Sequence, residues 1–551
     1  MRITETSRRA ARCSNLILLL GILAAGNGWC ADPASLSDSD PLLDLFVKKG
    51  YVTQEEAEKV KAEADALRTN GLANAMPAPS RWKITSGIQS VQLFGDIRVR
   101  YEDRSVDDPS GNNIDLQRFR YALRFGLRGD AFDDFYYGLR LETAANPRSP
   151  WVTLGTSSGS SPYQGPFGKS TDTLGVGQVY IGWHPQDWVD VTVGKMPNLL
   201  YTTPMVWDND LNPEGAIERF KYPVGEADLF ANLGQFLYAD FNPNSASKGL
   251  GINGLIGQNT DNIFMFAWQG GLNYRITTNT SAKVAATLYN YIGLQRSSAN
   301  FQPSPFFGDP YVGEGAYYYF AGANPGYAPG YGGYSPGTTY NLPGGGYGSL
   351  SYPFNQVGLN HLLVVEVPFE FNFKISKLNA RLFGDVAYNL EGADRARDAA
   401  AAYAAVLGPQ IASGVGIAHS FPAQTHDVKA YQIGFGIGNG DIVDGPMQGL
   451  VYGTGSYKHA WEVRTYWQHI EQYALDPNLV DSDFFEGREN LEGVYLALAY
   501  GFSDNFIGTF RYGHASRIND LLGTGGSNQD IPQMNPINDY QLFQVDMTLR
   551  F

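Results

Sequence analysis

Two short stretches of the sequence match patterns that carry chemistry in enzymes. Residues 333–337 read GYSPG, as around a hydrolase nucleophile, and residues 249–254 read GLGING, as in a dinucleotide-binding turn. Ser335 is followed by Pro336, which has no backbone N–H to stabilise an oxyanion. Neither stretch has the strand and helix that its pattern requires on either side, and the seven histidines show no metal-ligand spacing. We therefore expect no catalytic residue, no metal site and no cofactor.

The charged residues with the most informative spacing are arginines. In the stretch QRFRYALRFGLRG, residues 117–129, arginines alternate with large apolar residues. A strand has period two, so this segment has one basic and one apolar face, which must meet different surroundings. Together with a neighbouring segment it predicts a basic row that lines a water-filled interior: Arg98, Arg100, Arg118, Arg120, Arg124 and Arg128. The alternative is a hydrated wall in which these arginines have no specific role.

Residues 196–214 contain the carboxylates that would oppose this row. Asp208, Asp210 and Glu214 lie in a predicted loop, and if that loop folds into the interior it forms a constriction. Opposite charges on facing walls would then produce a transverse field that orients passing solutes. The alternative is a surface site for divalent cations or lipid headgroups.

The elements that would position these residues are strands. About sixteen alternating segments begin near residues 91, 116, 135, 174, 188, 215, 228, 263, 281, 361, 379, 428, 457, 491, 506 and 541. Short turns and long loops alternate between them, which is typical of a transmembrane antiparallel β-barrel with both chain ends at the short-turn rim. Residues 438–456 are too long for a short turn, so a missed or extended strand is expected there. No apolar run of about 18 residues follows the N-terminus, so helical spans are excluded.

The chain ends inside an alternating strand, YQLFQVDMTLRF. A strand in lipid must have every backbone group paired, so the last strand is predicted to close against the first. Its terminal residue, Phe551, is the expected assembly signal of the barrel.

The N-terminal residues are predicted to be a targeting signal and a small helical segment. Residues 1–30 combine arginines with a short apolar core, which is typical of a cleaved signal peptide; a lipoprotein cut before Cys30 is the alternative. Residues 31–85 are predicted to form a periplasmic helical hairpin and linker, and residues 86–551 the barrel. Removal of residues 1–30, with four arginines and one glutamate, changes the net charge from −15 to −18, which argues against nucleic-acid binding.

Residues 193–216 read VGKMPNLLYTTPMVWDNDLNPEGA. This stretch resembles the putative porin family of Gram-negative outer membranes, distant kin of phosphate-selective porins. The segments DSDFFEGRENLEG and LLDLFVKKGYVTQEEAEKV resemble the same family. The resemblance implies a multi-pass protein of the outer membrane whose water-filled channel passes small hydrophilic solutes and ions by diffusion. It also implies contact with lipid and lipopolysaccharide, insertion by the barrel-assembly machinery, and a homotrimer.

Two other functions stay open at this stage. A barrel with long loops also suits a surface receptor or adhesin, and such a protein would have a plug or a lumen filled by loops. An outer-membrane hydrolase would need a Ser/His pair on adjacent strand ends, and none is found in the predicted strands.

Overall fold

The computed structural model describes residues 87–109, 111–144, 149–155, 173–239, 263–292, 340–341, 347–348, 361–400, 422–440, 445, 447–454, 457–524, 530–531, 534 and 536–551. The chain divides into two compact units, Met1–Lys83 and Ile84–Phe551, and all described residues belong to the second. The predicted signal peptide, residues 1–30, and the whole of the predicted helical hairpin and linker, residues 31–85, therefore lie outside the described residues.

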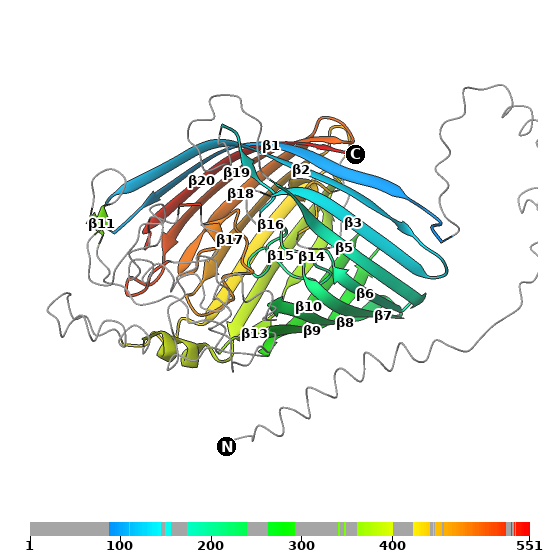
Figure 1. The fold of residues 1–551 in the computed structure, drawn as a ribbon, viewed down its shortest axis with the longest axis horizontal. Helices are drawn as coiled ribbons and strands as arrows, with labels where there is room; N and C mark the ends of the chain where they lie inside the picture. The colour runs from blue at the N-terminus through cyan, green and yellow to red at the C-terminus, as the bar shows by residue number, and fades with distance from the viewer. Residues whose placement is uncertain are drawn as a thin grey trace, which may run out of the picture. The chain divides into compact units, whose positions relative to one another are not determined.

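Sixteen strand positions form the wall of the described barrel (Figure 1). In the first half they are β1 (Gln92–Asp107), β2 (Asn113–Asp130), β3 (Phe135–Ala144), β5 (Thr173–Gln186), β6 (Val189–Lys195), β7 (Glu214–Val224), β8 (Ala227–Ala239) and β9 (Ile263–Thr277). In the second half they are β10 (Thr280–Ile292), β13 (Leu363–Glu366) continued by β14 (Phe369–Ile375), β15 (Leu378–Asn389), β16 (Lys429–Gly438), β17 (Trp461–Ile470), β18 (Leu491–Gly501), β19 (Phe506–Arg517) and β20 (Asp539–Arg550). The prediction of about sixteen strands is confirmed.

The wall is closed because the last strand pairs with the first. Each strand is antiparallel to its neighbours, and the β1–β20 register runs from Asp96 opposite Arg550 to Asp107 opposite Asp539. Beyond the ladder, Gly95 and Phe551 exchange backbone hydrogen bonds of 3.0 and 3.1 Å. A Cβ on Gly95 would lie 2.7 Å from the Phe551 ring, so the close approach of the two ends depends on glycine at this position.

The alternation of side chains explains why these segments form a membrane wall. On β2, Phe119 is 57% exposed and points outward, whereas its neighbour Arg120 is buried inside. The same pattern recurs around the wall, with outward-facing residues such as Ile181, at 61% exposure, in contact with the surroundings. An apolar outer face and a polar inner face are the arrangement that a bilayer requires of a barrel.

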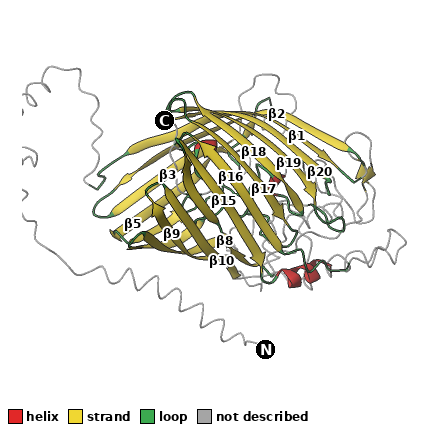
Figure 2. Ribbon diagram, turned by 180° about the vertical axis from the view of Figure 1, so that it is seen from behind, coloured by secondary structure: helices red, strands yellow, loops and turns green. Residues whose placement is uncertain are grey.

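Short turns lie at one rim and long connections at the other, except that the connection between β16 and β17, at the short-turn rim, is long. Strand β1 begins and β20 ends at the short-turn rim, and Figure 2 shows a helical segment, residues 392–400, at the end of the barrel away from the C-terminus. Two further pairings lie within long connections: β4 (Val152–Thr153) adds to β2, and β11 (Tyr340–Asn341) pairs with β12 (Tyr347–Gly348). In the part of the chain that the structure describes, no helix is long and apolar enough to cross a membrane.

The prediction of a missed or extended strand within residues 438–456 is wrong. The described part of this connection contains a short 3₁₀ helix, η4 (Leu450–Tyr452), and Leu450 and Val451 are buried. The connection is long because it folds back inside the barrel, where wall side chains bind its backbone. A second 3₁₀ helix, η5 (Phe485–Gly487), lies in a long connection at the other rim.

Candidate functional site

Residues 196–213, between β6 and β7, form a crossing loop that lies inside the barrel. Three consecutive residues bind three side chains of the far wall. The backbone N–H and carbonyl of Tyr201 bond the side chain of Gln269 on β9 at 2.9 and 2.8 Å. The hydroxyls of Thr202 and Thr203 donate to Glu366 on β13 and Asp385 on β15.

Apolar side chains hold the same loop against the wall. Met196 and Met205 are fully buried, and the Trp207 ring packs against Phe236 and Tyr289 with centroids 6.3 and 6.5 Å apart. Burial of large apolar side chains stabilises a packed arrangement by roughly 1.5–3 kcal/mol each. The loop is therefore a fixed part of the interior.

Asp208 joins the crossing loop to the connection of residues 471–490, here called the 471–490 loop. Its carboxylate accepts hydrogen bonds from the backbone N–H and hydroxyl of Ser482, at 3.1 and 2.9 Å. Burial raises the pKa of Asp208 to about 7, and the nearby carboxylates of Asp210, on the same loop, and Asp483, on the other loop, add to this effect. The pKa of Asp481, also on the 471–490 loop, is raised for the same reasons, with Asp208 and Asp483 as its main acidic neighbours. The contact between the loops therefore contains carboxyl groups that burial favours in the neutral form.

The other side of the crossing loop reaches the opposite wall. Asp210 forms an ion pair with Arg124 on β2, which also bonds Glu142 on β3 at 3.2 Å. The loop thus spans the interior, from β9, β13 and β15 on one side to β2 on the other. Glu214 takes no part in this arrangement, contrary to the prediction: it begins β7, points outward, is half exposed and pairs with Lys195 at 2.5 Å.

All six arginines of the predicted row occupy inward positions of β1 and β2. Their partners are close: Arg100 binds Asp546 on β20 at 2.7 Å and Asp483 on the 471–490 loop at 2.6 Å. Arg118 binds Glu102 on β1 and also Asp530, in the connection before β20, at 2.6 Å. Arg120 lies 3.4 Å from Glu102.

The remaining two arginines lie nearer the short-turn rim. Arg98 binds Asp96 at 2.6 Å, and Arg128 donates to Gln92 at 2.9 Å and stacks on Phe94. Positive and negative groups of this region are therefore mostly in direct contact. The expected separation of charge across an open lumen is not what the structure shows, because loop carboxylates reach the wall.

Wall arginines also hold the inward connection between β16 and β17. Arg381 on β15 donates to the carbonyls of Gly445 and Gln448 at 2.6 and 3.0 Å. Arg464 on β17 donates to the Gln448 carbonyl at 2.6 Å, and Arg511 on β19 to the Val451 carbonyl at 3.0 Å. The inward segment 447–454 is thus bound from three different strands.

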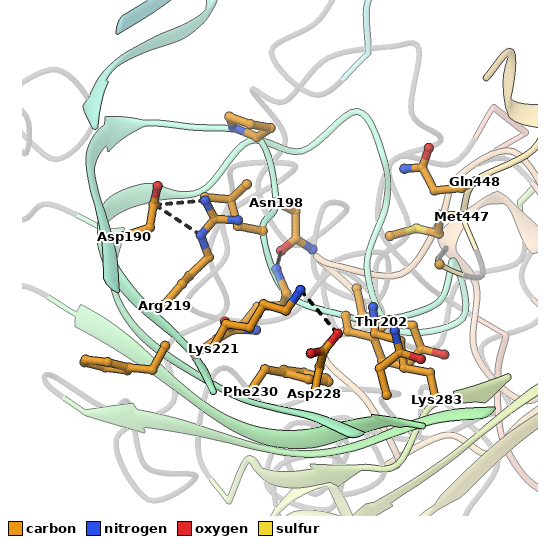
Figure 3. A pocket seen from close by; sticks show the side chains of 18 of the residues that line it. Asp190, Asn198, Thr202, Arg219, Lys221, Asp228, Phe230, Lys283, Met447 and Gln448 are labelled. Atoms are coloured by element: carbon orange, nitrogen blue, oxygen red, sulfur yellow. Dashed lines mark hydrogen bonds and ion pairs between the residues drawn. The ribbon is translucent and has the colours of Figure 1, made fainter. Parts of the chain in front are cut away.

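A cavity of about 630 Å³ lies beside the crossing loop, on the side of β5 to β10 (Figure 3). Its charged side chains on β6 to β8 are paired: Arg219 binds Asp190 at 2.8 Å and Lys221 binds Asp228 at 3.3 Å. Amides from several elements face it as well, and the inward segment contributes Met447 and Gln448. Residues 197–202 of the crossing loop line one side of this cavity.

The family comparison matches most of the chain. Residues 105–305 and 350–551 match the family described as putative porin. The chain belongs to the putative porin family. It is therefore a channel of the Gram-negative outer membrane that crosses the bilayer many times and serves solute diffusion.

Comparisons with solved structures and curated proteins add little beyond this. A structure titled "High pH structure of Pseudomonas putida OprB" is 10% identical, with 85% of this chain and 94% of that chain covered and a TM-score of 0.40. A second, titled "Asymmetric conductivity of engineered proteins", is 9% identical, with coverages of 84% and 100% and a TM-score of 0.33. No curated protein matches the porin chain.

The residues of this porin that dock the crossing loop were not found from the sequence. Gln269, Glu366 and Asp385 are inward residues of β9, β13 and β15, and only the fold brings them to the crossing loop. The sequence does contain one signal for them, because each is a polar residue at an inward position of a predicted strand. Their contact with Tyr201, Thr202 and Thr203 is seen only in the structure. In the described residues, no group of three or more His, Cys, Asp or Glu side chains is arranged to hold a metal ion.

Proposed function

We propose that small hydrophilic solutes and ions diffuse through this porin along the cavity on the β5 to β10 side, past the crossing loop. The observation that carries the proposal is the attachment of the crossing loop to both walls, through Tyr201–Thr203 on one side and Asp210 on the other. A strap fixed at both sides narrows the interior without depending on a flexible tip. The cavity of about 630 Å³ leaves room for solvent beside it.

The test is conductance of the purified protein in planar bilayers. Stepwise openings in potassium chloride are expected, with a conductance that reflects one narrow passage. Bilayers that stay silent at high protein load would contradict the proposal. The same result would favour the receptor or adhesin function, since the inward packing of several loops is the feature expected of that alternative.

The arginine row is proposed to anchor loops and to set only a weak charge preference. Arg100, Arg118 and Arg124 each bind a carboxylate of an inward connection. Paired charges produce weak fields at a distance, so near-neutral selectivity or a weak preference for anions is expected. Reversal potentials in a salt gradient measure this, and strong cation selectivity of the parent channel would contradict it.

A homotrimer is proposed on the family resemblance and on one feature of the outer face. Glu218 on β7 and Gln235 on β8 point outward and bond each other at 2.7 Å, between apolar neighbours such as Leu233. A carboxylate that faces lipid is unfavourable, so a protein surface is the better neighbour for this pair. We propose that a second copy of the chain covers it. The mass of the complex in mild detergent, compared between the parent and Glu218→Arg, tests this; a monomeric parent would contradict it.

The remaining partners are proposals too. The apolar outer band supports contact with acyl chains and, at the long-loop rim, with lipopolysaccharide. The pairing of Phe551 with Gly95 supports a role for the last residue in recognition by the barrel-assembly machinery and in closure. Membership of a family of porins supports passage without a chemical step, so we propose that the chain is not an enzyme.

A further inference from the structure

Several polar groups that line the cavity have no acceptor among the described residues. Asn198, on the crossing loop, accepts the Leu200 N–H through its side-chain oxygen at 3.0 Å, and this bond fixes the orientation of the amide. The amide nitrogen is therefore the unpaired atom, and it is buried. Arg140 on β3 has a buried Nε without an acceptor, although its Nη2 lies 3.0 Å from Glu142. Both unpaired atoms are hydrogen-bond donors.

Lys283 on β10 adds a positive charge to the same cavity (Figure 3). No described carboxylate lies within the 4.0 Å of an ion pair, in contrast to Arg219 and Lys221. Its ammonium lies instead 4.5 Å from the ring centroid of Tyr201 and 5.4 Å from that of Phe230. Aromatic faces attract an ammonium group and leave its N–H donors available.

These groups share one chemical requirement, because donors and an unbalanced cation need an acceptor that carries negative charge. Two of the three carboxylates that line the cavity are already paired, Asp190 with Arg219 and Asp228 with Lys221; the third, Asp187, lies in the turn between β5 and β6. The rings of Tyr201 and Phe230 beside Lys283 suit the carbon part of an organic anion. An inorganic anion has no apolar part that could contact these rings.

We propose that the cavity is a binding site for small organic carboxylates, with Lys283 binding the carboxylate and the rings of Tyr201 and Phe230 contacting its apolar part. Asn198 and Arg140 supply further donors along the cavity. This site lies next to the constriction, so a carboxylate that pauses there obstructs the current of other ions. The inference rests on the proposed passage through this cavity.

The test uses benzoate as the probe, with benzyl alcohol and inorganic phosphate as comparisons. Benzoate is expected to reduce the potassium chloride current of single channels with saturation, whereas benzyl alcohol and phosphate have weaker effects at equal concentration. Lys283→Gln is expected to raise the half-blocking concentration about tenfold or more, since a charge-assisted contact is lost. Lys221→Gln is the matched control, because it removes the same charge from a side chain that Asp228 already balances, and its half-blocking concentration is expected within about threefold of the parent.

A second variant separates binding from folding. Asn198→Asp retains the oxygen that accepts the Leu200 N–H and replaces the free donor by a negative charge, so benzoate block is expected to disappear. Heat-modifiable migration on gels checks that each variant is a folded barrel. Equal loss in Lys283→Gln and Lys221→Gln, or equal block by benzoate and phosphate, would overturn the proposal.

Calorimetric titration of benzoate in detergent gives the same comparison without conduction. If the channel conducts potassium chloride but neither assay detects benzoate, the carboxylate site is refuted and the porin function stands. If no current flows but benzoate binds with dependence on Lys283, the site stands and the proposed passage is refuted.

Discussion

Removal of the two threonine hydroxyls should release the crossing loop from the wall. In the double variant Thr202→Val, Thr203→Val the side chains keep nearly the same volume, but the hydrogen bonds to Glu366 and Asp385 are lost. Hydrogen bonds to charged or buried acidic groups contribute about 1.5–3 kcal/mol each, so the docked state loses about 3–6 kcal/mol. Since about 1.4 kcal/mol corresponds to a factor of ten, the equilibrium between undocked and docked loop should shift about 10²- to 10⁴-fold.

Alkylation of a cysteine at position 205 measures this equilibrium directly. Met205 belongs to the crossing loop and is fully buried when the loop is docked, so the thiol of Met205→Cys reacts only when the loop leaves the wall. The two natural cysteines, Cys13 and Cys30, lie in the predicted signal peptide and are removed by use of a foreign signal. With a slow reagent, the labelling rate follows the open population, so the valine pair should raise it about a hundredfold or more.

The control is Thr192→Val in the same Met205→Cys background. Thr192 is a buried wall threonine on β6 whose hydroxyl bonds Tyr136 at 2.8 Å and Asp190 at 3.3 Å, both on the wall. Its substitution should change the labelling rate less than about threefold, because the loop docking is untouched. If the valine pair also changes the rate by less than that, the two hydroxyls do not hold the loop and the docking argument fails.

Three other changes test the remaining contacts. The loop contact at Asp208 should weaken as pH rises from about 4 to about 7, since burial raises its pKa to about 7 and ionisation opposes docking; open-channel noise should be larger at pH 8 than at pH 5, and Asp208→Asn should reduce this dependence, with Asp481 responsible for the rest. Arg118→Gln together with Arg120→Gln should weaken the attachment of Asp530, which then keeps Arg104, at 3.2 Å, as an ion-pair partner, so current fluctuations should increase more than the reversal potential shifts; a large shift without added noise would restore the pore-lining interpretation. Deletion of Phe551 should reduce the amount of folded barrel in the outer membrane, and a normal level by heat-modifiable migration would contradict its role.

The wall of this porin was predictable because lipid imposes a simple rule on each strand. In segments such as 117–129, apolar residues recur at every second position, which predicts both a strand and its inward face. All six arginines of the predicted row do occupy inward positions. Their partners could not be predicted. Asp530 and Asp483 lie hundreds of residues from β1 and β2, in connections whose path has no periodic pattern.

The errors have the same physical origin. The length of residues 438–456 does not suit a turn and therefore predicts a missed or extended strand, whereas arginines from β15, β17 and β19 bind the backbone of this connection inside the barrel. Glu214 was grouped with Asp208 and Asp210 by nearness in sequence. The register of β7 separates it from them and places it on the outer face.

Closure of the wall by β1 and β20 has a consequence for biogenesis. These two strands are joined by the whole length of the barrel chain, so none of their twelve cross-strand pairs forms until the last strand has been secreted. The entropy of ring closure increases only with the logarithm of chain length, so the late encounter itself adds little to the barrier. The open sheet that precedes it has two long unpaired edges, which are templates for aggregation. These edges stay unpaired for the whole interval between export of β1 and arrival of β20. The crossing loop must enter the barrel before β1 and β20 pair, or afterwards from the long-loop rim.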